Sequence, residues 1–249
     1  MQNGAVGSGS AEVDHPVYPV AASPERVEGL KEAVAPLMAM SEEEMVGLVP
    51  DRTGFRFVGC PHCNEGSHQS QLVWTIEDPH HVRCRYCDMG FPNETYPEDR
   101  VLKVTNPVGE EDAYPYWEDG DGNLYYFSAR GWWYARFYFA SQAKDLGVLY
   151  QATGDRQYAR RAALILDTFA RYYPGFLVCL DEVHFPKAFY REPPFPRRGG
   201  KWGEWRYKEI PTDLVFAYDS IYASGAMERL SGAAGADVRL EHEGDARLN

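Results

Sequence analysis

The chain lacks any long hydrophobic run, and its positive charge is scarce. No apolar stretch approaches the roughly 18 residues that a transmembrane helix needs, so the sequence predicts no membrane span. Among 249 residues there are 25 Lys and Arg against 37 Asp and Glu, which gives a formal net charge of −12. A general nucleic-acid-binding protein has the opposite balance, so nucleic acid is disfavoured as a partner.

The pattern of a secretory signal is also missing from the first residues. Met1 to Ser10 has neither a basic start nor the apolar stretch that follows it in a signal peptide. Taken alone, this favours the cytoplasm, a conclusion that a different start site would reverse.

Cysteine is rare, but four of the five cysteines form two matched pairs. Cys60-Pro-His-Cys63 and Cys84-Arg-Tyr-Cys87 are separated by twenty residues. The CxxC spacing lets two thiolates bind one tetrahedral zinc ion from a tight knuckle, and two knuckles complete a closed site. The spacing therefore predicts one structural Zn²⁺ held by Cys60, Cys63, Cys84 and Cys87.

Other interpretations of the cysteines are two disulfides, four free thiols, or a histidine in place of one sulfur. A disulfide within CxxC closes a strained ring, and long-range pairing does not require the matched spacing. His62 and His68 lie inside the module, although four cysteines already fill the tetrahedron. The fifth cysteine, Cys179, stands in an apolar run and is interpreted as a small buried hydrophobe.

The pattern along the chain divides it into five regions. Residues 1–23 are a small-residue leader that we expect to be flexible, and residues 24–50 form helices, with Ser41 and Glu44 at the spacing of a capping box. Residues 51–127 form a β-rich zinc module with short strands near 55–58, 71–76, 81–85 and 101–105. Asp119 to Asn123 fails the calcium-loop pattern and is interpreted as a hairpin turn.

Helical periodicity follows over residues 128–234. Apolar residues at steps of three and four predict a helix to about Ala152 and a second helix that stops at Pro174. Gly154 and Asp155 supply a C-terminal glycine and a new N-cap, so the two helices form an antiparallel hairpin. A third helix is expected from about Thr212 to Leu230, and residues 235–249 form a flexible tail.

One segment combines positive charge with aromatic rings. Between Lys187 and Lys208 there are seven basic residues against two acids, a local charge of +5, in a chain that is 14% aromatic. Guanidinium groups bind carboxylate or sulfate, and flat rings stack on sugar faces. The candidate substrate-binding residues are Arg191, Lys201, Trp202 and Trp205. The alternatives are a solvated loop whose rings pack in the core, and a site for single-stranded nucleic acid.

Several stretches together resemble a known family. They are Gly131-Trp-Trp-Tyr-Ala-Arg-Phe-Tyr-Phe-Ala140, the hairpin phrase Leu149-Tyr-Gln-Ala-Thr-Gly-Asp155 within residues 146–174, and residues 208–222 with their Tyr-Asp pair. They look like the opening helices of the heparinase II/III-like polysaccharide lyases, which share an incomplete (α/α) toroid with alginate and chondroitin AC lyases. Residues 48–60 and the knuckles are similar to an N-terminal region of a bacterial branch. The resemblance covers residues 25 to 235.

The resemblance implies a mainly α fold, a partial (α/α) toroid of antiparallel helix hairpins preceded by the zinc module. It implies β-elimination on a uronic-acid-containing polysaccharide and an extracytoplasmic or periplasmic location. In the family, Tyr and His act with an Asn or similar residue on later helices and on the following domain. His184 matches no such motif, so we expect the catalytic machinery beyond this chain, in the missing C-terminal part of a longer protein. The alternatives are a non-catalytic protein that binds anionic glycans or serves as a scaffold, and a zinc-ribbon nucleic-acid-binding protein.

Overall fold

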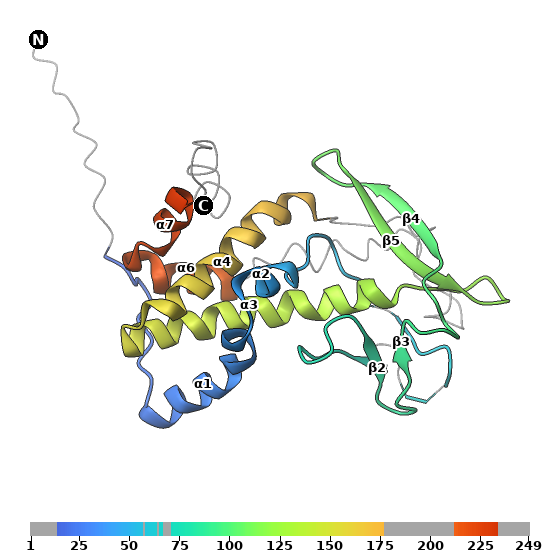
Figure 1. Cartoon of the computed structure of the whole chain (residues 1–249), viewed down its shortest axis with the longest axis horizontal. Helices are drawn as coiled ribbons and strands as arrows, with labels where there is room; N and C mark the ends of the chain where they lie inside the picture. The colour runs from blue at the N-terminus through green and yellow to red at the C-terminus, as the bar shows by residue number, and fades with distance from the viewer. Residues whose placement is uncertain (1–13, 57, 64, 67–70, 177–211, 234–249) are drawn as a thin grey trace, which may run out of the picture.

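The computed structural model describes residues 14–56, 58–63, 65–66, 71–176 and 212–233. In these residues, two small antiparallel β-sheets and a four-cysteine cluster are followed by packed helices. The longest helix, α3 (Phe127–Thr153), runs along the molecule, with the sheets near its N-terminal end and the other helices near its C-terminal end (Figure 1). The fold is therefore mixed α and β, where the sequence favoured a mainly α protein.

Both N-terminal helices begin at a serine cap, of which the one at Ser41 was predicted. Helix α1 (Pro24–Ala39) is capped by Ser23, whose side chain accepts from the backbone of Arg26. Helix α2 (Glu42–Gly47) has the predicted capping box, in which Ser41 and Glu44 each accept a bond from the other's backbone N–H. Each cap satisfies N–H groups that have no partner inside the helix.

The predicted helix hairpin is confirmed. Helix α3 ends at Gly154, whose φ of 72° is the left-handed conformation that glycine adopts without strain. Helix α4 (Arg156–Tyr172) then begins at Asp155, which accepts from the backbone of Gln157 at 2.9 Å. A short 3-10 turn, η1 (Tyr173–Gly175), follows it. The turn between the two helices is short, and α3 and α4 pack against each other as an antiparallel hairpin (Figure 1).

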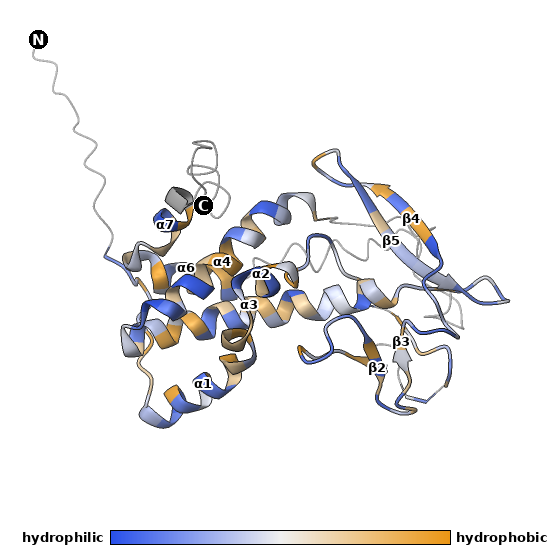
Figure 2. Cartoon of the chain, viewed as in Figure 1, coloured by the Kyte–Doolittle hydropathy of each residue, from blue (hydrophilic) through white to orange (hydrophobic). Residues whose placement is uncertain are grey.

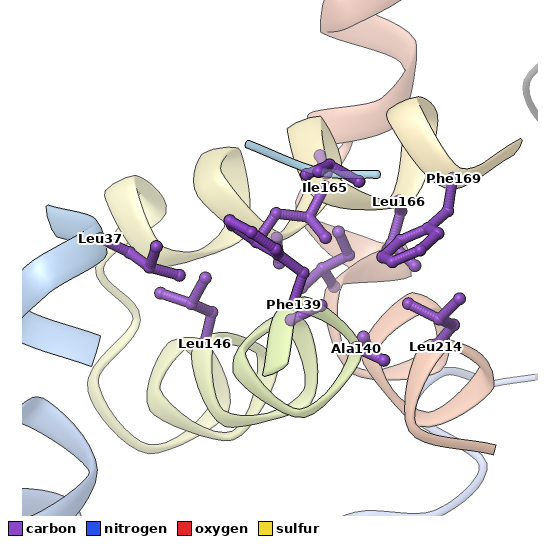
Figure 3. Close-up of a cluster of buried hydrophobic side chains, with 14 of the residues drawn as sticks. Leu37, Phe139, Ala140, Leu146, Ile165, Leu166, Phe169 and Leu214 are labelled. Carbon is purple, nitrogen blue, oxygen red and sulfur yellow. The ribbon is translucent and has the colours of Figure 1, made fainter. Parts of the chain in front are cut away.

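The core lies between α3, α4 and α6 (Thr212–Ile221). Figure 3 shows its side chains interdigitating from α1, α3, α4 and α6, and the labelled leucine, isoleucine and phenylalanine residues are fully or almost fully buried. Gly147 allows α3 and α6 to approach closely, because a Cβ at this position would lie 2.8 Å from the Cβ of Ser220. Figure 2 shows polar and apolar residues interspersed along the same helices.

The prediction of one helix from Thr212 to Leu230 is wrong. Helix α6 (Thr212–Ile221) passes into a 3-10 turn, η4 (Tyr222–Ser224), and α7 (Ala226–Ala233) follows. Gly225 adopts the left-handed conformation, with a φ of 64°. The side chain of Ser224 accepts a hydrogen bond from the backbone N–H of Ala226 at 3.0 Å. These residues end one helix and cap the next.

The first sheet has the strand order β1 (Leu72–Val73), β2 (Val82–Cys84) and β3 (Gly90–Phe91). The second has the order β4 (Arg100–Thr105), β5 (Glu111–Glu118) and β6 (Leu124–Tyr125). The predicted turn from Asp119 to Asn123 joins β5 to β6, and Asp119 accepts from two backbone N–H groups of this turn.

The strand expected at residues 55–58 is not formed by the described residues of that segment. Phe55 instead donates its backbone N–H to the carbonyl of Ala129 on α3 at 2.8 Å. Gly54 makes this contact possible, because a Cβ at this position would lie 2.0 Å from the backbone nitrogen of Trp133. The segment is thus used to bind a helix rather than to extend a sheet.

Residues 14–23, the described part of the expected leader, lie against the helices. His15 Nδ1 lies 2.7 Å from a carboxylate oxygen of Asp219, and the backbones of Val17 and Tyr18 donate to the same carboxylate. Asp219 is almost completely buried beneath them. No described helix is long and apolar enough to cross a membrane.

Candidate metal centre

The four predicted cysteines come together at one end of the first sheet. Their sulfur atoms all lie within 4.8 Å of one another, and the Cys60–Cys87 and Cys63–Cys84 pairs are each separated by 3.7 Å. With Zn–S bonds of about 2.3 Å, the edge of a tetrahedron of sulfurs is about 3.8 Å. The donor set therefore fits a tetrahedral ion such as zinc. All four are free cysteines, which contradicts the disulfide interpretation.

Backbone hydrogen bonds shape the second knuckle. Cys84 ends β2 and donates its N–H to the carbonyl of Met89, while Asp88 donates to the carbonyl of Cys84 at 2.9 Å. Asp88 has a φ of 58°, the left-handed conformation that aspartate tolerates better than most residues. The chain is thereby turned so that Cys84 and Cys87 present their sulfurs to the same point.

Gln71 organises the first knuckle, and the sequence reasoning missed it. Its buried side chain accepts from the N–H of Cys60 at 2.9 Å and donates to the carbonyl of Glu65 at 2.7 Å. Partners of this kind fix the direction of metal ligands. The available signal was a polar residue directly before the apolar strand β1, at a position that turns out to be fully buried.

The centre is partly shielded from water. Cys60 and Cys84 are buried, and Cys63 and Cys87 are half-buried. Burial raises the pKa of the Cys60 thiol, so a metal ion must displace a proton to bind there. Four thiolates leave no open coordination position, so an ion held here would organise the fold rather than activate a substrate.

The histidine alternatives find no support among the described residues. The Nδ1 atom of His62 lies 3.1 Å from the hydroxyl oxygen of Tyr96, on the exposed side of the knuckle. His68 lies outside the described residues. Among the residues that the structure describes, cysteine sulfurs are the only donor atoms gathered in this cluster.

A buried arginine connects the metal module to helix α3. Arg130 is 1% exposed, and its guanidinium donates to the backbone carbonyl of Arg56 and, at 2.6 Å, to the hydroxyl of Tyr134. Tyr134 in turn donates to the carbonyl of Leu72 in β1 at 2.7 Å. The guanidinium also lies 4.6 Å from the ring centroid of Trp133, and burial lowers the pKa of Arg130 to about 10. The sheet is thus attached to the helix by polar groups as well as by apolar packing.

Glu98 attaches the second sheet to the start of α3. Its carboxylate accepts from the backbone N–H of Ser128 at 2.9 Å and from the hydroxyl of the same residue. The side chain of the N-cap residue itself, Tyr126, makes no capping hydrogen bond to the helix. Burial outweighs these bonds and raises the pKa of Glu98 from 4.5 to about 7.

Glu98 is therefore expected to make stability depend on pH. Its pKa is higher in the folded chain, so its contribution is complete below pH 4.5 and is lost as pH rises through about 7. The unfolding free energy of the wild type relative to Glu98→Gln should fall by about 3 kcal/mol over this range. Denaturant titrations of both proteins at several pH values measure this difference. The pH dependence of metal binding is the same in both proteins, so it cancels in the difference. Glu94→Gln, at an exposed position of the same loop, is the control, and an equal pH profile for wild type and Glu98→Gln would contradict the prediction.

The other predicted site residues lie outside the described residues. These are the candidate substrate-binding residues Arg191, Lys201, Trp202 and Trp205, together with Cys179 and His184.

Comparison with protein-family models, with curated proteins and with solved structures finds no significant match to this chain. The function must therefore be argued from the residues and their geometry.

Proposed function

We propose that this chain is the N-terminal part of a heparinase II/III-like polysaccharide lyase, with a structural Zn²⁺ bound to Cys60, Cys63, Cys84 and Cys87. The whole protein would cleave a uronic-acid-containing polysaccharide by β-elimination, with its catalytic residues beyond this chain. The observation that carries the proposal is the antiparallel pair α3–α4 packed against α6, because repeated helix hairpins of this kind build an (α/α) toroid.

An exposed apolar face supports the idea that further helices follow. Among the described residues, five of the nine exposed large hydrophobic residues lie on the stretch from α6 to η4 or on the segment that crosses it. They are Val17, Tyr18, Val215, Phe216 and Tyr222, with exposed fractions between 39% and 61%. The rings of Tyr18 and Phe216 touch at 5.8 Å between centroids. A gathered apolar surface is a feature of an interface, and the next helices of an array would cover it.

The metal has a supporting role in this proposal. Bound zinc would hold the two knuckles together, and the contacts through Tyr134 and Arg130 would pass that rigidity to α3. Beta-elimination needs a base and a group that neutralises the sugar carboxylate. A closed four-thiolate site offers neither.

The glycan-binding part of the proposal rests on the basic aromatic segment. Replacing both Arg191 and Lys201 by Ala should weaken the binding of uronic-acid oligomers and flatten its dependence on salt, because exposed charges are screened within about 10 Å at 0.1 M ionic strength. Calorimetric titration of both proteins with the same oligomer at two salt concentrations measures the effect. Arg26 and Lys31 on α1, also replaced by Ala, are a control of equal charge.

Two outcomes would count against this function. Equal affinity of the wild type and the Arg191/Lys201 double variant at both salts would contradict the glycan-binding role. A rise in ultraviolet absorbance from unsaturated uronate ends, produced by this chain alone on heparan sulfate, chondroitin or alginate, would contradict the placement of the catalytic residues beyond it.

A further inference from the structure

A cleft of about 650 Å³ lies between the N-terminal helices and the loop that joins β1 to β2. This volume is within the range of small-molecule sites, about 300 to 1,000 Å³. Its lining is mainly apolar and comes from α1, from α2, from the residue that follows each of these helices, and from the loop. The apolar lining residues are Pro36, Ala39, Met40, Leu48, Ile76 and Pro79.

Both walls of the cleft are held in place by hydrogen bonds. The indole of Trp74 donates to the carbonyl of Pro79 at 2.9 Å and fixes the loop. On the opposite side, the guanidinium of Arg161 donates to the carbonyls of Leu37 and Met40, at 3.1 and 2.7 Å, and fixes the end of α1. The cleft is therefore formed before any ligand arrives, which lowers the entropic cost of binding.

The charged side chains that line the cleft directly have one sign, whereas the guanidinium of Arg161 lies behind one wall and is bonded to backbone carbonyls. Glu44 and Glu77 line the cleft, and neither Lys nor Arg is among the described lining residues. The backbone N–H of Ser41 donates to Glu44 at 2.8 Å and lowers the pKa of this carboxyl, so the charge is present and oriented at neutral pH. His80 is the remaining polar lining residue.

We propose that this cleft binds an organic cation, an ammonium or guanidinium group carried on an apolar aliphatic or aryl body. The apolar lining would remove the body of the ligand from water, and Glu44 and Glu77 would pair with its charge. The ligand class is opposite in charge to the anionic glycan of the proposed function, so this site does not depend on that function.

Three probes with one body and different charge test the proposal on the full, zinc-loaded chain at pH 7.5. They are 4-phenylbutylamine, 4-phenylbutan-1-ol and 4-phenylbutanoate. Titration followed by calorimetry or by NMR should show saturable binding of the amine, with the carboxylate at least about tenfold weaker and the alcohol between them.

Variants then assign the binding to the cleft. The double variant Glu44→Gln, Glu77→Gln should bind the amine about tenfold less tightly and leave the alcohol unchanged. Glutamine keeps the capping box of α2, so the helix is retained. Glu43→Gln, on the same helix but outside the lining, is the matched control. Met40→Trp, which fills the cleft, should weaken all three probes.

Four results would overturn the proposal. Three of them are equal affinity for the three probes, an unchanged amine affinity in the double variant, and binding that Met40→Trp does not weaken. The absence of saturable amine binding at millimolar concentration would overturn it as well.

Discussion

Removal of zinc is expected to unfold the first sheet and its two knuckles. Apparent zinc-binding free energies of small structural sites are about 10 kcal/mol or more near neutral pH, and much of that energy is folding energy. The three strands β1, β2 and β3 contain only two or three residues each and have few ladder hydrogen bonds of their own. Without the metal, a sheet with such short strands and so few hydrogen bonds is too small to be stable on its own.

Metal analysis of the purified chain should find one zinc per chain. Cys84→Ser should lose the metal and sharply lower the temperature at which the first sheet and its knuckles unfold, whereas Cys179→Ser, which changes the cysteine outside the two pairs, should keep the metal. Affinity should fall on acidification, because the thiolates are protonated. Wild-type protein with clearly less than one zinc, or a Cys84→Ser variant that melts as the wild type does, would contradict the assignment.

The effect of zinc removal should be local. Hydrogen exchange after chelation is expected to show loss of protection in β1, β2 and β3, with protection retained in the paired parts of α3 and α4. Those parts of the helices bury their own core, which the metal does not touch. Simultaneous loss of protection throughout the helices would show that the described chain unfolds as one unit.

Phe139→Ala is expected to be the most damaging single change in the helical core. Phe139 is fully buried between α3 and α4 (Figure 3), and removal of a buried phenyl ring costs about 3–5 kcal/mol from lost burial and the cavity that remains. Denaturant unfolding monitored by far-UV circular dichroism measures this loss.

Phe137→Ala is the matched control for this change. Phe137 lies on the same helix but is 37% exposed. Its loss should cost about 1 kcal/mol, in keeping with its ring contact to Trp133. Equal destabilisation by the two substitutions would show that the core is not where the structure places it.

The elements that could be predicted from sequence are those whose cause lies within a few residues. The capping box of Ser41 and Glu44, the turn at Gly154 and Asp155, and the hairpin turn after Asp119 all depend on local hydrogen bonds and on φ angles. The gathering of the four cysteines was predictable for a related reason. The CxxC spacing limits each pair to one geometry, and a single ion that binds both pairs requires them to meet.

The sequence predictions that were wrong concern segments whose conformation depends on tertiary packing or on a single glycine. The segment at residues 55–58 has the composition of a strand, but Gly54 lets its backbone approach α3. The periodicity from Thr212 to Leu230 is continuous, but Gly225 turns the chain between two helices. In both cases a single glycine overrides a pattern averaged over many residues, because it permits a close approach or a left-handed conformation that other residues resist.

The sequence by itself determined the capping box of α2, the antiparallel hairpin and the set of clustered cysteines, because each of these depends on the chemistry of neighbouring residues or on a spacing that suits one metal ion. Only the tertiary structure decided that Gln71 orients a knuckle, that Asp219 binds residues 15–18 and that Glu44 and Glu77 meet at one cleft. Asp219 lies about 200 residues from the groups it accepts from, and Glu44 and Glu77 come from a helix and a loop. Such contacts depend on how whole elements pack, which no local pattern records.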